Sequence, residues 1–314
     1  MFVDILMILG GLVALYLGAE GLVRGASSMA LRLGITPLVV GLTVVSFGTS
    51  APELLVCLLG TDDISVGNII GSNVSNLALI LGAAALVRPI EVKSRAVRRE
   101  MPVMLAATVL FMLLAMNGTL SQTDGFILLG AMICYLFYMY MQARRDMEAY
   151  EALIGDELGE VDPTGTTPVK DVLFIIGGMI GLAGGAWLMV EGAISISTAL
   201  GISELVIAIS VVAFGTSLPE LATSMVASFR GESDISVGNV IGSNIFNLLF
   251  VMGVVVSLGA IVVGEDALRI DMWVMLGVSI GIWPLLRTGH VLSRWEGALM
   301  LLVYTVYIVS LFLR

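Results

Sequence analysis

The sequence predicts an all-α membrane protein whose ten transmembrane helices form two inverted five-helix repeats. Three observations support this: an apolar composition, ten apolar segments of spanning length, and an internal repeat containing five of them. Of the 314 residues, 58% are hydrophobic and only 13% are charged, whereas soluble domains contain about 25% charged residues. Membrane lipid is therefore the expected surrounding, and the net charge of −10 argues against a nucleic-acid partner.

The spans follow from the need for about 20 apolar residues to cross the hydrocarbon core. The ten predicted spans are residues 2–33, 37–59, 64–87, 100–116, 123–142, 171–200, 204–229, 235–263, 270–286 and 295–313. In the first span, Glu20 and Arg24 are one helical turn apart and are expected to neutralise each other. Cys57 and Cys134 lie inside apolar runs, so we expect neither a disulfide nor a cysteine metal site.

Basic residues are distributed unequally between the two sides of these spans. Alternate loops place twelve on one side and only Arg269 and Arg314 on the other. Because basic loops tend to stay in the cytoplasm, both termini are expected outside the cell membrane. We predict a first repeat at 1–142, an acidic cytoplasmic linker at 143–170, and a second, inverted repeat at 171–314.

The internal repeat is clearest in two polar stretches. Residues 46–53 match residues 213–220 at an offset of 167, and residues 64–73 match residues 235–244 at an offset of 171. Five spans per period make the second copy enter the membrane from the opposite side. Inverted repeats recur in secondary transporters, which bind substrate near the midplane. A duplicated structural bundle without transport is the alternative.

Two glutamates, Glu53 and Glu220, lie midway along apolar spans. A carboxylate there costs several kcal/mol unless it is paired or hydrated, which makes both residues functional candidates. Helical spacing places further polar residues on the same stripe in each span and on a stripe in the following span. These stripes contain Ser46, Thr49 and Ser50 with Glu53, then Thr216 and Ser217 with Glu220, then Ser65, Asn68, Ser72 and Asn76, and finally Ser236, Asn239, Ser243 and Asn247.

Each glutamate directly follows a proline. Pro52 and Pro219 lack an N–H group, so each removes one hydrogen bond from its helix and crowds the preceding turn. We expect the helices to break near residues 48–49 and 215–216. In lipid, the freed carbonyl groups must be satisfied by protein, water or an ion.

The resulting set of ligands contains only oxygen and carries two negative charges. Calcium accepts six to eight oxygens in flexible geometry, whereas magnesium requires a tighter octahedron. Zinc would prefer nitrogen or sulfur. Sodium can use the same oxygens, and two carboxylates are neutralised by one Ca²⁺ or two Na⁺. For Asn68 and Asn239, packing between helices is the expected role.

At these residues the chain resembles the calcium/cation antiporter superfamily, and within it the prokaryotic sodium/calcium exchanger branch. The elements Gly-Thr-Ser-x-Pro-Glu and Gly-Ser-Asn-x-x-Asn, each present twice, carry the resemblance across nearly the whole chain. It implies that the second, third, seventh and eighth helices are broken around a central ion site. The implied calcium ligands are Glu53 and Glu220 with carbonyls near Thr49 and Thr216; the implied sodium ligands are Ser50, Ser72, Ser217 and Ser243, with Asn76 and Asn247 close by.

Some positions refine this expectation. Ser46 and Ala213 are further candidate positions, because alanine is common at both and the extra hydroxyl of Ser46 would alter affinity. Asn247, where potassium-dependent relatives carry an acid, favours potassium-independent transport. The Gly-Thr-Ser-x-Pro-Glu pattern favours sodium coupling and electrogenic exchange, with a proton/calcium antiporter as the alternative.

We expect a transporter that is active as a monomer, without enzymatic activity or a cofactor. The remote alternative is an intramembrane protease acting through Ser217. The only histidine, His290, lies in a loop without a counterpart in the first half, so a Ser–His pair is not expected.

Overall fold

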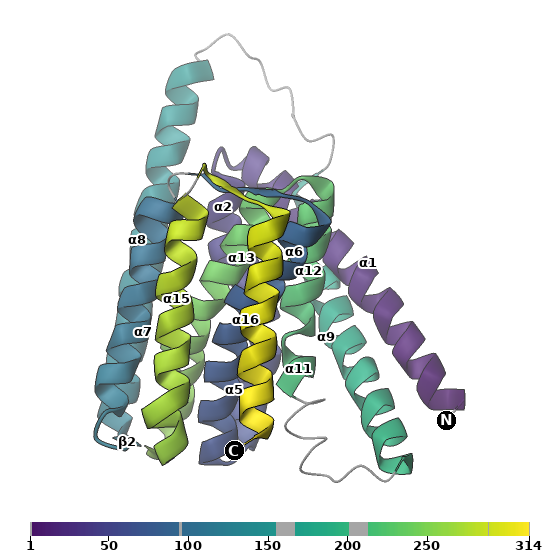
Figure 1. Cartoon of the computed structure of the whole chain (residues 1–314). Coiled ribbons are helices and arrows are strands. Elements are labelled where there is room, and N and C mark those ends of the chain that lie inside the picture. Colours follow the sequence, from purple (N-terminus) through teal and green to yellow (C-terminus); the bar gives the residue numbers. More distant parts are fainter. Residues whose placement is uncertain (1, 94–95, 155–166, 201–212, 288, 314) are drawn as a thin grey trace.

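The computed structural model describes residues 2–93, 96–154, 167–200, 213–287 and 289–313, which form a bundle of helices (Figure 1). Elements labelled η are π-helical. The first half contains α1 (Phe2–Arg32), α2 (Pro37–Val40), η1 (Gly41–Val45), α3 (Ser46–Thr49), α4 (Ala51–Leu59), α5 (Asp62–Val74), η2 (Ser75–Ile80), α6 (Leu81–Val87), η3 (Ala96–Glu100), α7 (Met101–Ala115) and α8 (Gln122–Ile154). The second half contains α9 (Pro168–Ala199), α11 (Ala213–Thr216), α12 (Leu218–Arg230), α13 (Ser233–Ile245), η6 (Phe246–Val251), α14 (Met252–Leu258), η7 (Ala267–Asp271), α15 (Met272–Arg287) and α16 (Arg294–Phe312).

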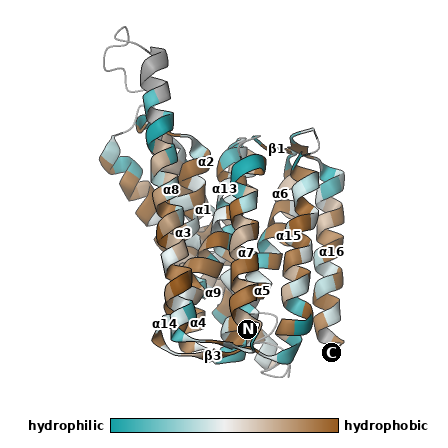
Figure 2. Ribbon diagram, turned by 90° about the vertical axis from the view of Figure 1, so that its left-hand side faces the viewer, coloured by the Kyte–Doolittle hydropathy of each residue, from teal (hydrophilic) through white to brown (hydrophobic). Residues whose placement is uncertain are grey.

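Within the described residues, eight helical segments are long and apolar enough to cross a membrane. Hydrophobic residues cover most of their length, and hydrophilic residues gather toward the two ends of the bundle (Figure 2). The predicted span at 100–116 corresponds to α7, which has 15 residues and continues directly from η3. The predicted span at 204–229 falls partly outside the described residues, because these omit 201–212.

The prediction of a mainly helical protein is confirmed, with one addition: in the part of the chain that the structure describes, four two-residue strands form two antiparallel pairs. β1 (Ile90–Glu91) pairs with β4 (Val291–Leu292), and β2 (Thr119–Leu120) pairs with β3 (Ile261–Val262). Each pair joins a loop of the first half to a loop of the second half, and the pairs lie at opposite ends of the bundle (Figure 2). Backbone pairing between loops is a tertiary interaction, which helical periodicity does not reveal.

A second difference concerns the segment predicted as a linker from residue 143. Helix α8 continues without a break to Ile154, twelve residues beyond the predicted boundary at 142. This extension is polar, with several charged residues after residue 143, and Arg144 pairs with Glu148 one helical turn later at 3.6 Å. Such a pair stabilises a helix, because residues four positions apart lie on the same helical face. Residues 155–166 of the predicted linker lie outside the described residues.

Helices α1 and α9 pack against each other along most of their length. Their order of contact is antiparallel, because Gly11 faces Gly185 while Gly25 faces Asp171. Small residues let the two backbones approach closely, as is common in membrane helix pairs. A Cβ atom on Gly18 would lie 2.7 Å from the backbone nitrogen of Leu182, so a larger residue would separate the helices.

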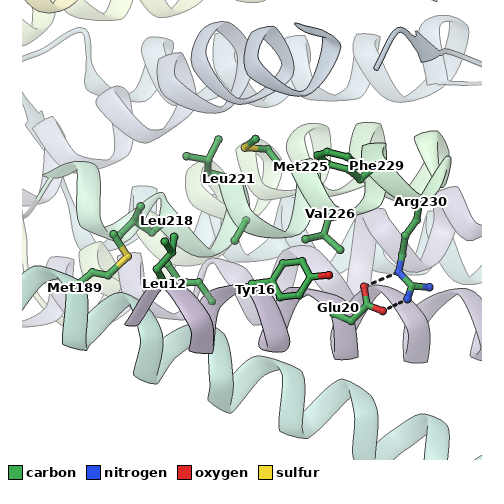
Figure 3. Close-up of a pocket in the computed structure, with 12 residues that line it drawn as sticks. Leu12, Tyr16, Glu20, Met189, Leu218, Leu221, Met225, Val226, Phe229 and Arg230 are labelled. Atoms are coloured by element: carbon green, nitrogen blue, oxygen red, sulfur yellow. Dashed lines mark hydrogen bonds and ion pairs between the residues drawn. The ribbon is translucent and has the colours of Figure 1, made fainter. Parts of the chain in front are cut away.

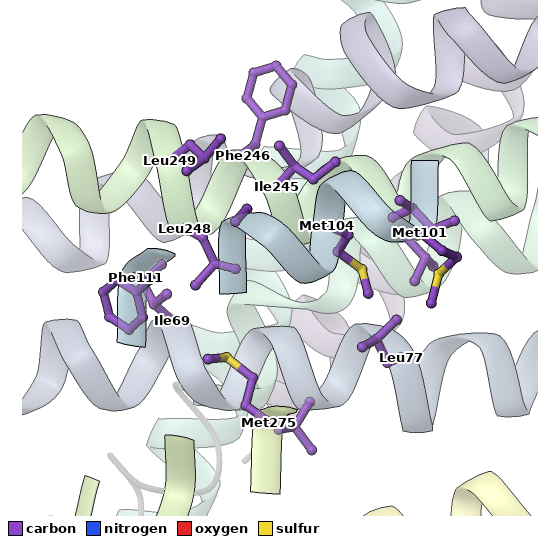
Figure 4. Close-up of a cluster of buried hydrophobic side chains, with 14 of the residues drawn as sticks. Ile69, Leu77, Met101, Met104, Phe111, Ile245, Phe246, Leu248, Leu249 and Met275 are labelled. Atoms are coloured by element: carbon purple, nitrogen blue, oxygen red, sulfur yellow. The ribbon is translucent and has the colours of Figure 1, made fainter. Parts of the chain in front are cut away.

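The centre of the bundle is formed by two continuous helical rods, α5–η2–α6 and α13–η6–α14. Of the apolar window of each rod, 78% is buried, compared with 39% or less for the other candidate spans. Side chains from these rods pack with those of α7 and α15 in the main hydrophobic cluster (Figure 4). Ile69, Met104, Phe111, Leu248 and Met275 are among its members, and each is at most 1% exposed. The cluster packs the two rods against each other.

The expected pairing of Glu20 with Arg24 is wrong. The Glu20 carboxylate instead binds Arg230, at the end of α12, through Nε at 2.6 Å and through a second contact with Nη2. Arg24 lies over the ring of Phe174, with 5.9 Å between Cζ and the ring centroid. Sequence spacing identified a possible partner within the helix, but the packing of α12 against α1 provides a better one.

Candidate cation-binding site

Both helix breaks occur slightly later than predicted. Helix α3 ends at Thr49 and α4 begins at Ala51, with Ser50 between them at φ −82° and ψ 3°. The second half repeats this arrangement at Ser217, with φ −84° and ψ 0°. The prolines explain the position, because each falls in the first turn of the new helix, where its missing N–H group is not needed.

The two breaks place Glu53 and Glu220 in the first turns of α4 and α12. Both residues have no solvent exposure, and they are close enough for the charge of one carboxylate to act on the other. The first turn of a helix carries a partial positive charge, which favours a carboxylate there. That partial charge cannot neutralise two buried anions, so the arrangement favours a cation between them.

The other predicted ligand side chains are also buried. Those of Ser46, Thr49, Ser50, Ser72, Asn76, Thr216, Ser217, Ser243 and Asn247 are at most 6% exposed. Ala213 is the first residue of α11, and its side chain lies outside the described part of the structure.

Several of these groups make no hydrogen bond of standard geometry within the described part of the chain. They are both carboxylates, the hydroxyls of Ser50, Ser72 and Ser217, the side-chain oxygen of Asn76 and the amide of Asn247. The Ser72 hydroxyl lies near the Glu53 carboxylate, and the hydroxyls of Thr49 and Ser50 lie near that of Glu220. A buried polar atom without a partner is costly, and a bound cation would satisfy these oxygens together.

Two asparagines, Asn68 and Asn239, which the sequence assigned to packing between helices, hydrogen-bond to the helix breaks. The Thr49 hydroxyl donates to Oδ1 of Asn239 at 3.1 Å, and the Thr216 hydroxyl donates to Oδ1 of Asn68 at 3.2 Å. Under the repeat offsets, Thr49 corresponds to Thr216 and Asn68 to Asn239, so the two bonds are equivalent. Each asparagine precedes a candidate ligand, Ser72 or Ser243, by one helical turn. This spacing was the sequence feature that could have placed both asparagines beside the site.

The second hydrogen-bonding group of each asparagine also has equivalent partners. The Asn239 amide donates to the Ser224 hydroxyl at 3.0 Å and to the backbone carbonyl of Glu220 at 3.4 Å. The Asn68 amide donates to the sulfur of Cys57 at 3.6 Å. Cys57 corresponds to Ser224 under the offset of 167. Each asparagine therefore links the break of the opposite half to the glutamate-bearing helix of its own half.

The hydroxyl of Ser46 points toward a contact between helices. It donates to the carbonyl of Gly41 at 2.7 Å and lies 3.1 Å from the carbonyl of Asn239. A Cβ atom on Gly242 would lie 2.2 Å from this hydroxyl, so α13 requires glycine there. A role for the Ser46 side chain as a cation ligand stays a prediction.

A further polar contact joins the two central rods. The Asn76 amide donates to Oδ1 of Asn244 at 3.0 Å, and the Asn244 amide donates to the carbonyl of Asn73 at 3.4 Å. Under the repeat, the counterpart would join Asn247 to Asn73, but within the described residues Asn247 has no hydrogen-bond partner. The site is therefore close to symmetric in its residues but not in its hydrogen bonds.

Among the described residues, no group of three or more His, Cys, Asp or Glu side chains could hold a metal ion. A cation at the centre would therefore depend on two carboxylates supplemented by hydroxyl, amide and carbonyl oxygens. This chemistry suits hard cations such as Ca²⁺ and Na⁺. Fold and site together define a multi-pass membrane protein with two buried carboxylates at a candidate cation site.

Comparisons with known proteins identify the family. The profile of the family described as "Sodium/calcium exchanger protein" matches residues 3–141 and 170–313. The inner membrane protein YrbG of Escherichia coli is 38% identical over 98% of this chain and 96% of its own. The sodium/calcium exchanger MaX1 of Methanosarcina acetivorans is 31% identical over 99% of both chains.

The fold also matches solved structures. The sodium-calcium exchanger NCX_Mj, soaked with 10 mM Na⁺ and no Ca²⁺, superimposes with a TM-score of 0.84 at 31% identity, over 99% of both chains. The chain belongs to the sodium/calcium exchanger protein family.

Proposed function

We propose that this protein exchanges Na⁺ for Ca²⁺ across the cell membrane by alternating access. The observation that carries the proposal is the pair of fully buried carboxylates, Glu53 and Glu220, surrounded by oxygens without hydrogen-bond partners in the described residues. One Ca²⁺ or two Na⁺ would neutralise this pair, so the two ions compete for one set of ligands. The relatives named as sodium/calcium exchangers support the same pair of substrates.

We assign the ligands by their chemistry. Glu53 and Glu220, helped by backbone carbonyls near Thr49 and Thr216, hold Ca²⁺, because the highest negative charge lies there. The hydroxyls of Ser50, Ser72, Ser217 and Ser243 provide neutral oxygens for Na⁺, and the side chains of Asn76 and Asn247 complete the centre. A neutral Asn247 adds no third charge, which favours transport independent of K⁺.

Electrostatics gives a reason for exchange rather than one-way transport. An unneutralised pair of carboxylates in a dry interior is costly, and moving it through an occluded state without a cation would keep that cost. Loading with Ca²⁺ or with Na⁺ removes most of it. The site therefore changes its exposure readily when it is loaded, so the movement of one ion requires the return of the other.

The architecture we propose has ten transmembrane helices in two inverted repeats, at 1–142 and 171–314, joined by the segment 143–170. The antiparallel packing of α1 and α9, which occupy equivalent places in the two repeats, supports inversion. With the excess of basic residues in the cytoplasm, both termini lie outside and the joining segment lies inside. One chain holds both glutamates, so a monomer would suffice.

The proton-coupled alternative rests on the same two carboxylates, which could carry protons instead of Na⁺. The hydroxyl and amide oxygens around them favour Na⁺, because protons would leave those oxygens without a role. The protease alternative has little support. The backbone of His290 accepts a hydrogen bond from Val92 beside the β1–β4 pair, whereas Ser217 lies buried at a helix break.

The test is calcium uptake by proteoliposomes that contain the purified protein. Vesicles loaded with Na⁺ and diluted into Na⁺-free medium should accumulate Ca²⁺, and vesicles with equal Na⁺ on both sides should not. Uptake that needs no Na⁺ and follows an imposed pH gradient would instead assign the protein to the proton-coupled class. Absence of uptake under both gradients, in vesicles with folded protein, would contradict calcium antiport.

A further inference from the structure

A cavity of about 640 Å³ lies between α1 and α12 (Figure 3). Its walls are almost entirely apolar, with Leu12 and Tyr16 from α1 and Leu221, Met225 and Phe229 from α12. Leu12, Tyr16 and Phe229 are each more than half exposed, so the cavity opens onto the surface that faces lipid. The ion pair between Glu20 and Arg230 closes one end of it (Figure 3).

A second cavity of about 870 Å³ continues beyond this ion pair, because Arg230 lines both cavities. Its lining combines charged side chains, among them Arg24, Lys170 and Glu232, with apolar ones such as Leu31 and Leu173. The two cavities follow each other along α1, from Leu12 to Glu20 and then from Val23 to Leu31. At 1.5 Å per residue, each section is about 12 Å long. An apolar compartment therefore leads directly into one whose walls also carry charged side chains.

Two positive charges in the second cavity are available to a ligand. The Arg230 guanidinium is engaged by Glu20, and the Glu232 carboxylate accepts a hydrogen bond from Ser27 at 2.9 Å. Among the described residues, neither Arg24 nor Lys170 forms an ion pair, and both side chains are exposed. The ring of Phe174, which also lines this cavity, lies beneath the guanidinium of Arg24.

We propose that the two cavities together bind one anionic phospholipid. An acyl chain occupies the apolar cavity between α1 and α12, and the phosphate lies beside Arg24 and Lys170. A phospholipid matches the order of the two cavities along α1. Its hydrocarbon chain would lie toward the middle of α1, and its negatively charged phosphate would lie toward the end of α1 at Arg32. It also comes from the surrounding membrane, into which the cavity opens. Bound there, it would connect α1 and α9 to α12, the helix that carries Glu220.

Native mass spectrometry of the delipidated protein, equilibrated with equimolar phosphatidylglycerol and phosphatidylethanolamine, measures this binding directly. We expect wild type to retain one phosphatidylglycerol in clear preference to phosphatidylethanolamine. The double substitution Arg24→Gln and Lys170→Gln should weaken phosphatidylglycerol binding about thirty-fold, or about 2 kcal/mol for two basic side chains near an anionic lipid. Arg98→Gln with Arg287→Gln removes the same charge from exposed positions outside the cavities and should have no such effect.

The apolar cavity has its own variants. Ala222→Trp or Leu12→Trp fills it from opposite walls and should reduce retention of both lipids. Leu299→Trp, at an exposed position on α16, should not. Thermal unfolding shows whether each variant is folded. Because the two tryptophan substitutions are independent, the test remains valid if one of them prevents folding.

Lipid binding at this site does not depend on which ions the protein transports, so transport results leave it unaffected. Equal retention of the two phospholipids by wild type would overturn the proposal. The proposal would also be overturned if the Arg98/Arg287 control lost as much phosphatidylglycerol binding as the Arg24/Lys170 variant. Unchanged lipid retention by folded Ala222→Trp and Leu12→Trp would overturn it as well. Displacement of phosphatidylglycerol by an equal concentration of palmitate or of inorganic phosphate would overturn the phospholipid assignment and show a simpler anion site.

Discussion

The hydroxyl group of Thr49 donates a hydrogen bond of 3.1 Å to the side-chain oxygen of Asn239, although the two residues are 190 positions apart. The equivalent bond from Thr216 to Asn68 makes the contact reciprocal. Each threonine ends the short helix before a break, so each half orients the broken helix of the other. The threonine side chain at each break is thereby held by an asparagine of the opposite repeat.

Asn239→Ala should weaken calcium binding without abolishing turnover. Loss of a buried hydrogen-bond partner costs about 1–3 kcal/mol, and Thr49 would lose its orientation, so we expect the KM for Ca²⁺ to rise about tenfold. Initial rates of calcium uptake, fitted separately for KM and kcat, measure this. The control is Asn73→Ala, because among the described residues the Asn73 amide bonds only the carbonyl of Ile69, in its own helix, at 2.7 Å. A similar change in both variants would leave a general packing effect as the explanation.

Glu53→Gln or Glu220→Gln should reduce calcium transport at least about a hundred-fold, because the amide keeps the shape but removes half of the charge at a buried site. Thermal unfolding should show a folded protein, since a buried neutral amide costs less than a buried carboxylate. Glu265→Gln is the matched control, because Glu265 is 80% exposed and pairs with Arg269 on the surface. Normal transport by either folded site variant would remove that glutamate from the ligand set.

Gly242→Ala should destabilise the protein, and Ser46→Ala should not rescue it. The added methyl group would lie 2.2 Å from the Ser46 hydroxyl but also 2.8 Å from the backbone of Leu42, which no side-chain change removes. Overpacking of this kind costs about 1–3 kcal/mol. Thermal unfolding in detergent measures the loss. Gly277→Ala, with open space around it, should be neutral or slightly stabilising. Full rescue by Ser46→Ala would mean that α13 can shift away from Leu42.

The connection between α4 and α5 and the equivalent connection between α12 and α13 should face opposite sides of the membrane. Asp62 accepts a hydrogen bond from Val262 of β3, whereas Gly231 lies against Arg88 near β1. A cysteine at Asp62 should react with an impermeant thiol reagent from outside, and one at Arg230 only from inside. The background protein should lack Cys57 and Cys134. If both engineered cysteines react from the same side, the repeats are not inverted.

Transport should carry net charge, with three Na⁺ entering for each Ca²⁺ that leaves. A 10⁴-fold calcium gradient costs about 5.5 kcal/mol, and two charges moving against about 100 mV add about 4.6. Each Na⁺ supplies about 3.7 kcal/mol from a tenfold gradient and the same voltage, so two are too few and three provide about 11. Calcium flux in proteoliposomes should therefore respond to a voltage set with potassium and valinomycin. Flux that ignores voltage would require an electroneutral cycle.

The sequence by itself was sufficient for the main polar features of the site. Two carboxylates inside apolar spans, each after a proline and each within a repeated motif, could be recognised without coordinates. The reason is that spacing along a helix determines which side chains share a face. It also predicted a helix break beside each glutamate, although the backbone breaks at Ser50 and Ser217, slightly later than expected.

Only the tertiary structure decided which faces meet. Helical periodicity could not show that Asn239 reaches Thr49, that the Ser46 hydroxyl is directed at carbonyls beside Gly242, or that Glu20 pairs with Arg230. Each of these contacts joins segments far apart in the chain. Their geometry depends on how closely two helices approach, which glycines and side-chain packing set together across the whole bundle.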